Sequence, residues 1–182
     1  MKLASPLLIT VLGASIVSAT QVLSQQSASA ASADPLARFF TGSRSCSGKS
    51  QDRDMKSFHA TTGKYTAEKV LDGHWVVIRY DEDKSAKSKE PFRVVQYFGY
   101  DMAKKNYVAI GLYNAAGVYS IGTSAGWKGG SITFDEGDTG KGPVFRDTFT
   151  TSHGAFTRHT GMMRDQDGQW VETDEETCTK PA

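Results

Sequence analysis

Two cysteines, Cys46 and Cys178, stand near opposite ends of the part of the chain that is patterned for folding. The residues ahead of them have the composition of an export signal, and exported proteins meet an oxidising environment in which cysteines pair. We therefore expect one disulfide that joins the first strand of the domain to its last. A closed loop of about 130 residues would stabilise the fold by roughly 5 kcal/mol, because the crosslink lowers the chain entropy of the unfolded state.

Residues 1–33 are predicted to be a secretory signal peptide. They carry one charged side chain, that of Lys2, followed by an apolar stretch at about 7–19 and then by small polar residues. A short basic start, a modest apolar core and A-x-A sites are typical of such a signal, and cleavage is expected after Ala19, Ala30 or Ala33. The apolar run is short and interrupted for a membrane span, so an uncleaved anchor is the less favoured alternative. We expect an exported protein, periplasmic or extracellular, with no stable membrane span after cleavage.

The mature chain, residues 34–182, is predicted to be one electrically balanced domain. Removal of residues 1–33 takes away one of the 21 basic residues, so that 20 basic residues face 20 acidic ones. A neutral balance without a basic stripe argues against binding to nucleic acid. The length suits a single core, and we find no internal repeat.

From residue 39 onward the chain is patterned as about ten short β segments separated by turn residues. The strongest is 74–80, which follows Asp72-Gly73, a pair that favours a two-residue hairpin. Two strands, 55–60 and 64–71, are expected on either side of Gly63, and 34–39 could form one short helical turn. The remaining expected strands are 39–49, 92–100, 106–113, 118–124, 131–135, 144–151, 155–164 and 169–178.

Short strands with short connections predict an all-β fold, a single antiparallel up-and-down β-barrel. Closing such a sheet makes its first and last strands neighbours, where Cys46 and Cys178 could meet. The barrel and the disulfide are therefore predictions that support each other.

Several short motifs carry a resemblance to a known family. They are residues 40–48, 71–75, 98–101 and 167–170, together with Cys178. With them the chain resembles a family of uncharacterised bacterial secreted proteins, a domain of unknown function with a lipocalin-like, or calycin-type, β-barrel. The resemblance implies a fold and no activity. Arg44 stands where such families commonly have tryptophan, which weakens a haem-binding reading like that of nitrobindin-like barrels, so no cofactor is expected.

Gly122 to Gly126 match the G-x-S-x-G pattern of a serine nucleophile. That arrangement needs a helix directly after the serine, and Gly126, Gly129 and Gly130 disfavour one, so we expect a strand running into a glycine turn. With no nucleophile and base at a recognisable spacing, no catalytic residue is assigned, and an enzyme that uses the barrel cavity is the least favoured function.

No metal site is predicted. The four histidines form no H-E-x-x-H motif, and no C-x-x-C pair accompanies them. Residues 165–168 resemble a fragment of a calcium loop without its closing glutamate, so we expect a hairpin turn there.

Arginines within predicted strands are the leading ligand-binding candidates. An inward guanidinium needs a carboxylate or a ligand anion, because burying it without a partner is costly. The alternative is structural pairing of Arg158 or Arg164 with Glu172, Asp174 or Glu176 across the sheet. With neighbouring aromatic and imidazole groups, the candidate ligand-binding residues are Trp75, Arg79, Tyr97, Arg146, Arg158 and His159.

The expected function is binding of a small hydrophobic or anionic amphipathic ligand, such as one bearing a carboxylate, inside the barrel. The main alternative is a structural or interaction barrel whose interior is filled by its own side chains. The ligand's identity and the oligomeric state are left open.

Overall fold

The computed structural model describes residues 34–52, 56–85, 91–114, 119–138 and 143–181. The predicted signal peptide lies outside these residues. The helix that the described chain contains has neither the length nor the hydropathy of a membrane-spanning helix.

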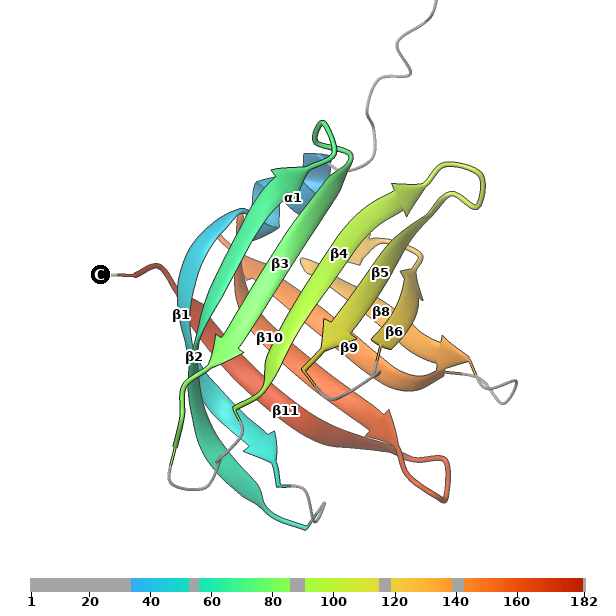
Figure 1. Cartoon of the computed structure of the whole chain (residues 1–182). Helices are drawn as coiled ribbons and strands as arrows, with labels where there is room; N and C mark the ends of the chain where they lie inside the picture. The colour runs from blue at the N-terminus through green and yellow to red at the C-terminus, as the bar shows by residue number, and fades with distance from the viewer. Residues whose placement is uncertain (1–33, 53–55, 86–90, 115–118, 139–142, 182) are drawn as a thin grey trace, which may run out of the picture.

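The described chain forms a closed antiparallel up-and-down barrel, as expected from the sequence and consistent with a lipocalin-like fold (Figure 1). Neighbours along the chain are neighbours in the sheet, and pairing of β1 with β11 and of β6 with β8 closes the circle. The two-residue β7 pairs with β8 alone. The elements are α1 (Asp34–Phe40), β1 (Gly42–Gln51), β2 (Phe58–Val70), β3 (Trp75–Glu82), β4 (Arg93–Asp101), β5 (Asn106–Tyr113), β6 (Tyr119–Ser124), β7 (Trp127–Lys128), β8 (Ser131–Asp138), β9 (Pro143–Ser152), β10 (Ala155–Arg164) and β11 (Trp170–Thr179).

The predicted disulfide is present and lies where the barrel closes. Cys46 of β1 is directly opposite Cys178 of β11, with the two Cα atoms 4.1 Å apart. Both side chains are buried. The bond therefore joins the first strand to the last, and it closes a loop with a sequence separation of 132.

Most strands have the expected bounds to within a few residues, but the segment around Gly63 was predicted wrongly. One long strand, β2, runs through this position instead of two strands separated by it. A Cβ atom at Gly63 would lie 2.7 Å from the ring and hydroxyl of Tyr80 on β3. The glycine therefore makes room for a side chain of the neighbouring strand and does not end its own.

The turn between β2 and β3 occurs where it was predicted but is longer than a two-residue hairpin. Val70 pairs with Trp75, which leaves four residues in the turn. Leu71, Asp72 and Gly73 all have positive φ angles, of 51°, 57° and 84°. Asp72-Gly73 therefore marks the turn without setting its length.

The interior, or lumen, is apolar at the end of the barrel where α1 packs. Phe40 of α1 lies among aromatic rings from three strands, with ring centroids 5.6 Å from Phe98, 5.3 Å from Phe149 and 5.7 Å from Phe156. The helix contacts β2, β3 and β10. This half of the lumen is filled by the protein's own side chains, which include Leu36, Phe40, Tyr65, Val76, Ile78, Phe98, Ile132, Phe134, Phe149 and Phe156.

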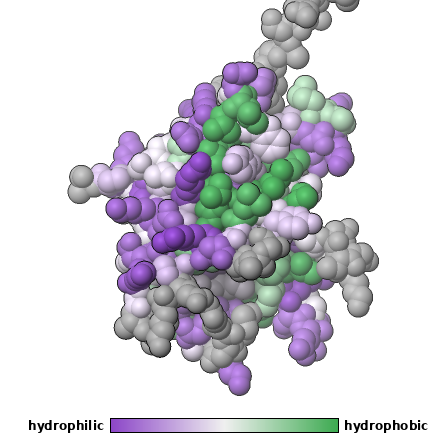
Figure 2. Space-filling model, in the orientation of Figure 1, coloured by the Kyte–Doolittle hydropathy of each residue, from purple (hydrophilic) through white to green (hydrophobic). Residues whose placement is uncertain are grey.

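The outer face of the barrel carries an apolar area over β4 to β6. Tyr97, Ile110 and Ile121 lie in one row across three strands, and Val95, Leu112 and Tyr119 lie in the next. Leu112, Tyr119 and Ile121 are 49%, 67% and 55% exposed. Figure 2 shows apolar residues gathered over β3–β5 in this view. We call Val95, Tyr97, Ile110, Leu112, Tyr119 and Ile121 the outer apolar face.

Candidate functional site

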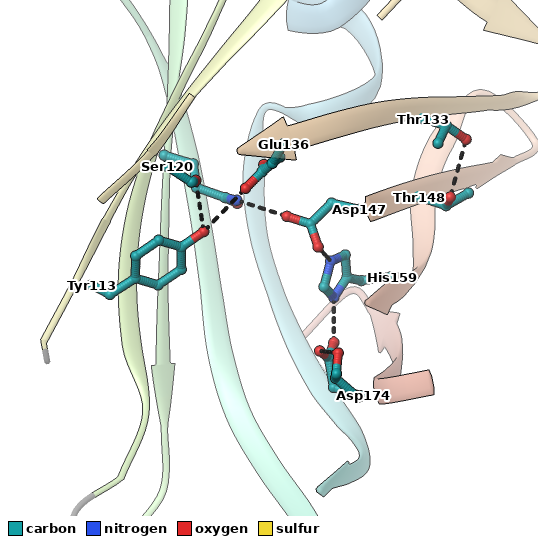
Figure 3. A network of polar contacts seen from close by, with 10 residues as sticks. Tyr113, Ser120, Thr133, Glu136, Asp147, Thr148, His159 and Asp174 are labelled. Atoms are coloured by element: carbon teal, nitrogen blue, oxygen red, sulfur yellow. Dashed lines mark hydrogen bonds and ion pairs between the residues drawn. The ribbon is translucent and has the colours of Figure 1, made fainter. Parts of the chain in front are cut away.

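The half of the lumen away from α1 is polar. Along β3 the inward residues change from Val76 and Ile78 to Tyr80 and Glu82, and along β8 they change from Ile132 and Phe134 to Glu136. Inward polar side chains of eight strands meet there, and part of the set is drawn in Figure 3. We call this set the lumen cluster: Tyr80, Glu82, Gln96, Tyr113, Ser120, Glu136, Asp147, His159, Asp174 and Glu176.

His159 is held between two carboxylates at the centre of the cluster (Figure 3). Its Nδ1 lies 2.9 Å from Oδ2 of Asp174, and its Nε2 lies 3.2 Å from Oδ1 of Asp147. Burial alone would lower the pKa of His159, but the two carboxylates outweigh it and hold that pKa well above its usual value. Burial would likewise raise the pKa of Asp174, and the His159 charge keeps it below its usual value. The ring is therefore an imidazolium at neutral pH that donates to both carboxylates.

A β-bulge decides which residue of β10 points into the lumen. Phe156 pairs with Thr151 and Arg158 with Thr150, so Thr157 is an extra residue in the ladder. Strict alternation from the buried Phe156 would put Arg158 inside. The bulge reverses the alternation and turns His159 inward instead.

Glu136 is a buried acid with one oxygen left over. Its side chain is 2% exposed, and its Oε2 accepts a hydrogen bond from the Tyr113 hydroxyl at 3.4 Å. That hydroxyl also lies 2.9 Å from Oγ of Ser120. Oε1 of Glu136 is buried and has no hydrogen-bond partner among the described residues. Burial, and then the nearby charge of Asp147, raise the pKa of Glu136 to about 8, so the group is mostly neutral at pH 7.

Asp147 connects the two parts of the cluster. One of its oxygens faces His159, and the other accepts a hydrogen bond from Nε2 of Gln96 at 3.3 Å. Its charge also acts on Glu136. A change of charge on Glu136 or on His159 therefore alters the electrostatic environment of the other residue through the Asp147 carboxylate.

Two further carboxylates extend the cluster along β3 and β11. Tyr80 donates a hydrogen bond to Glu176, whose pKa is raised chiefly by burial. Oε2 of Glu82 accepts a hydrogen bond from the backbone N–H of Phe92 at 2.7 Å, and its Oε1 lies 3.4 Å from Nε2 of His59. The lumen cluster is thus richer in acids than in bases.

Glycines opposite the cluster make the room that it occupies. A Cβ atom at Gly122 would lie 2.6 Å from Cγ of Glu136, and one at Gly161 would lie 2.1 Å from Oδ1 of Asp174. Gly111 is equally close to Ser120 and Tyr113. Each polar side chain therefore lies over a strand position that carries no side chain of its own.

Three of the predicted ligand-binding residues lie on the outside of the barrel. Arg79 is exposed, and Trp75 and Tyr97 are half-buried on the same outer face. The Trp75 ring packs on Gly99, where a Cβ atom would be 2.7 Å away. Trp75 and Arg79 share one face of β3, and that face is the outer surface and not the lumen.

The other two arginines are paired with carboxylates on the outer surface. Nε of Arg146 lies 2.6 Å from Oδ1 of Asp135, and its guanidinium lies 4.3 Å from the centre of the Trp170 ring. A nitrogen of Arg158 lies 2.6 Å from Oε1 of Glu175. Structural pairing is therefore found for Arg158, although its partner is Glu175 and none of the three acids considered. Of the six predicted residues, only His159 points into the lumen.

The other motifs behave as turns. Ser124 ends β6, and its Oγ accepts a hydrogen bond from the N–H of Gly126 at 3.2 Å; β7 follows and no helix. Oδ1 of Asp165 accepts hydrogen bonds from the N–H groups of Asp167 and Gln169, at 3.0 and 2.8 Å. Within the described ranges, no three His, Cys, Asp or Glu side chains are placed to hold a metal ion.

Two shallow depressions of about 290 and 300 Å³ occur on the described surface. Residues of β1, β2 and β3, including Arg79, line the first, and residues around the disulfide line the second. Neither includes a residue of the lumen cluster.

The chain matches no protein-family model, and a search of curated proteins finds no similar sequence. The lumen cluster is therefore the feature of the molecule from which a function can be inferred.

Proposed function

We propose that the protein is an exported binding barrel whose small ligand is held by the lumen cluster. The observation that carries the proposal is Oε1 of Glu136, a buried carboxyl oxygen without a hydrogen-bond partner among the described residues, in a residue that is 2% exposed. Leaving a buried polar atom unpaired costs about 1–3 kcal/mol, so such an atom persists where another group supplies the missing partner.

The arrangement favours binding over catalysis. His159 would be the natural general base, but its two carboxylate partners keep it protonated and occupy both ring nitrogens. A base must accept a proton from the substrate, and a ring held in this way has no free lone pair.

The chemistry of the ligand differs from the hydrophobic or anionic one expected from the sequence. The arginines that were to hold a carboxylate lie outside, and aromatic rings fill the apolar half of the lumen. The polar half is what supports binding. The ligand is therefore still proposed to lie inside the barrel, but at Glu136, Asp147 and His159.

Native mass spectrometry of protein purified from an exported fraction tests the proposal. We expect an additional bound mass that is lost in Asp147→Asn, because this change removes the charge linking Glu136 to His159. Glu175→Gln is the matched control, since it removes a carboxylate from the outer face. A bare protein mass throughout, with no lumen resonance shifted by any added small molecule, would contradict the proposal.

A second candidate function, an interaction barrel, is favoured by the outer apolar face. Soluble proteins seldom expose an apolar patch of this kind without a partner. Its six members carry no charge, and the charged residue in register with them is Arg79, opposite Val95. The occupant we propose for this largely uncharged face is a second copy of the chain. Sedimentation equilibrium of the wild type and of Ile121→Lys tests this: a concentration-dependent dimer lost in the variant supports it, and a monomer at high concentration contradicts it.

A further inference from the structure

We infer that the ligand of the lumen cluster is a small organic cation, a primary ammonium or guanidinium group, bound at Oε1 of Glu136 beside Asp147. This inference depends on the proposed function, because it names the ligand class of the same site. Nothing in the sequence motifs indicated it, since the cluster is assembled from single residues of separate strands.

The balance of charge in the lumen is the first argument. Five acidic side chains belong to the cluster, of which Glu136 is mostly neutral at pH 7, and one imidazolium, His159, lies among them; His59 lies beside Glu82, 3.4 Å from its Oε1. Buried charges need partners of opposite sign, because their loss of hydration is otherwise uncompensated. An added cation corrects this excess, whereas an added carboxylate would increase it. The members with a carboxylate are Glu82, Glu136, Asp147, Asp174 and Glu176.

The acceptors around Glu136 are the second argument. Besides the unpartnered Oε1, the Tyr113 and Ser120 hydroxyl oxygens lie close by, 2.9 Å from each other. An ammonium group has three donors and no acceptor, and a guanidinium has five donors in a plane, so both complement a site made of oxygens. The absence of side chains at Gly111 and Gly122 lets Glu136, Ser120 and Tyr113 lie against the backbone at this place.

A metal ion is the competing cation, and the geometry disfavours it. Ca²⁺ needs six to eight oxygens at 2.3–2.6 Å and Mg²⁺ needs a near-octahedral set. Within the part of the chain that the structure describes, no group of three His, Cys, Asp or Glu side chains converges in this way. The oxygens at Glu136 are spaced for hydrogen bonds.

Binding of a cation at this site should release a proton from Glu136. The titratable groups facing Glu136 are Asp147 on β9 and Tyr113 on β5, with His159 on β10 behind Asp147; β6 contributes the neutral Ser120. The pKa of about 8 means that Glu136 carries a proton at pH 7. A cation that pairs with the carboxylate displaces that proton, so its affinity should rise about tenfold per pH unit up to pH 8.

The test is an NMR titration with four probes at pH 6, 7 and 8. Butylammonium, 1-butanol and butyrate share an apolar body and differ in charge, and calcium chloride represents the metal. We follow the amide resonances of Gly122 and Gly161, which face Glu136 and Asp174. Butylammonium is expected to shift both and to bind at least tenfold more tightly than butanol or butyrate, with affinity rising about tenfold between pH 6 and 7.

Glu136→Gln supplies the matched variant, because it keeps the shape and removes both the charge and the displaced proton. It should weaken butylammonium binding at least tenfold at pH 8 and remove the pH dependence, while Glu175→Gln on the outer face should bind as the wild type does. Unchanged affinity in Glu136→Gln, an affinity independent of pH, or tighter binding of calcium would overturn the cation proposal.

The probes also separate the two proposals. Lumen shifts with butanol or butyrate as strong as those with butylammonium would overturn the cation inference and leave the binding barrel standing. No shift with any of the four probes, together with a bare mass in native mass spectrometry, would overturn both.

Discussion

Nδ1 of His159 and Oδ2 of Asp174 are 2.9 Å apart inside the barrel and join β10 to β11 next to the strand that closes the sheet. Replacing His159 with alanine should destabilise the fold by about 3–5 kcal/mol, because it leaves two buried carboxylates without their cation. Urea denaturation at pH 7 measures the loss. Arg158→Ala, which breaks an exposed ion pair one residue away, should cost less than about 1 kcal/mol. Equal losses in the two variants would show that the buried position of His159 has no special role.

Glu136 should make the fold less stable as the pH rises. Because burial raises its folded pKa from 4.5 to about 8, the folded state holds a proton that the unfolded state releases throughout this interval. Stability is then fully present below pH 4.5 and falls by at most about 1.4 kcal/mol per pH unit up to pH 8. Glu136→Gln cannot titrate, so its stability relative to the wild type should increase over the same interval. Denaturation curves of both proteins at pH 5, 6, 7 and 8 measure this difference, and parallel pH profiles would exclude it.

His159 and Asp174 should limit stability at the two ends of the pH scale. The raised pKa of His159 contributes stability that is present below about pH 6.5 and is lost as the pH rises through its folded pKa. The lowered pKa of Asp174 contributes stability that is present above about pH 3.9 and is lost as the pH falls through its folded pKa. NMR titration of the His159 ring should therefore show a charged ring at pH 7. A ring that is neutral at this pH would contradict the ion-paired arrangement.

The Cys46–Cys178 bond should be the largest single contribution to stability. Its loop of 132 positions lowers the conformational entropy of the unfolded chain. We expect the free energy of unfolding of the double variant Cys46→Ser, Cys178→Ser to be lower by up to about 5 kcal/mol. Chemical denaturation of the oxidised wild type and of the variant measures this. Reduced wild type serves as the control and should match the variant. A loss below about 1 kcal/mol would mean that the pairing of β1 with β11 holds the barrel closed without the bond.

Gly161 should tolerate no side chain. An alanine Cβ there would lie 2.1 Å from Oδ1 of Asp174, so the carboxylate must move away from His159. We expect a loss of about 1–3 kcal/mol for Gly161→Ala, as for other overpacked sites, and a lower pKa of the His159 ring in the same variant. Thr160→Ala, the neighbouring outward position, should change neither quantity. A His159 pKa unmoved in Gly161→Ala would show that Asp174 does not hold the ring.

The fold was readily predicted because its signals are local. Alternating residues and turn residues between them are visible along the chain, and 106–113 and 155–164 were expected with the bounds that β5 and β10 have. Gly63 misled the prediction because a glycine in a strand weakens it locally, whereas here it makes room for Tyr80 across the sheet. That contact joins two strands and cannot be read from either one.

The candidate site was poorly predicted because inward and outward positions depend on register. Arginines within strands were predicted to bind the ligand, because burying a guanidinium without a partner is costly. Arg79, Arg146 and Arg158 instead lie on the outer face. A usable signal was present along single strands, such as Ile132, Phe134 and then Glu136, where alternate positions change from apolar to acidic. It identifies a polar half of the lumen only after the strands are aligned at one end of the barrel.

By itself, the sequence determined an all-β chain of about ten strands with Cys46 and Cys178 brought together where the first strand meets the last. These properties follow from the two-residue period of a strand and from the turn residues, which act over a few positions. The tertiary structure alone decided that His159 lies inside between Asp147 and Asp174 and that Arg158 lies outside, because one extra residue in the β10 ladder reverses the alternation. The excess of acids in the lumen cluster follows from the register of the neighbouring strands, whereas the bulge decides which of two basic side chains, Arg158 or His159, lies among them.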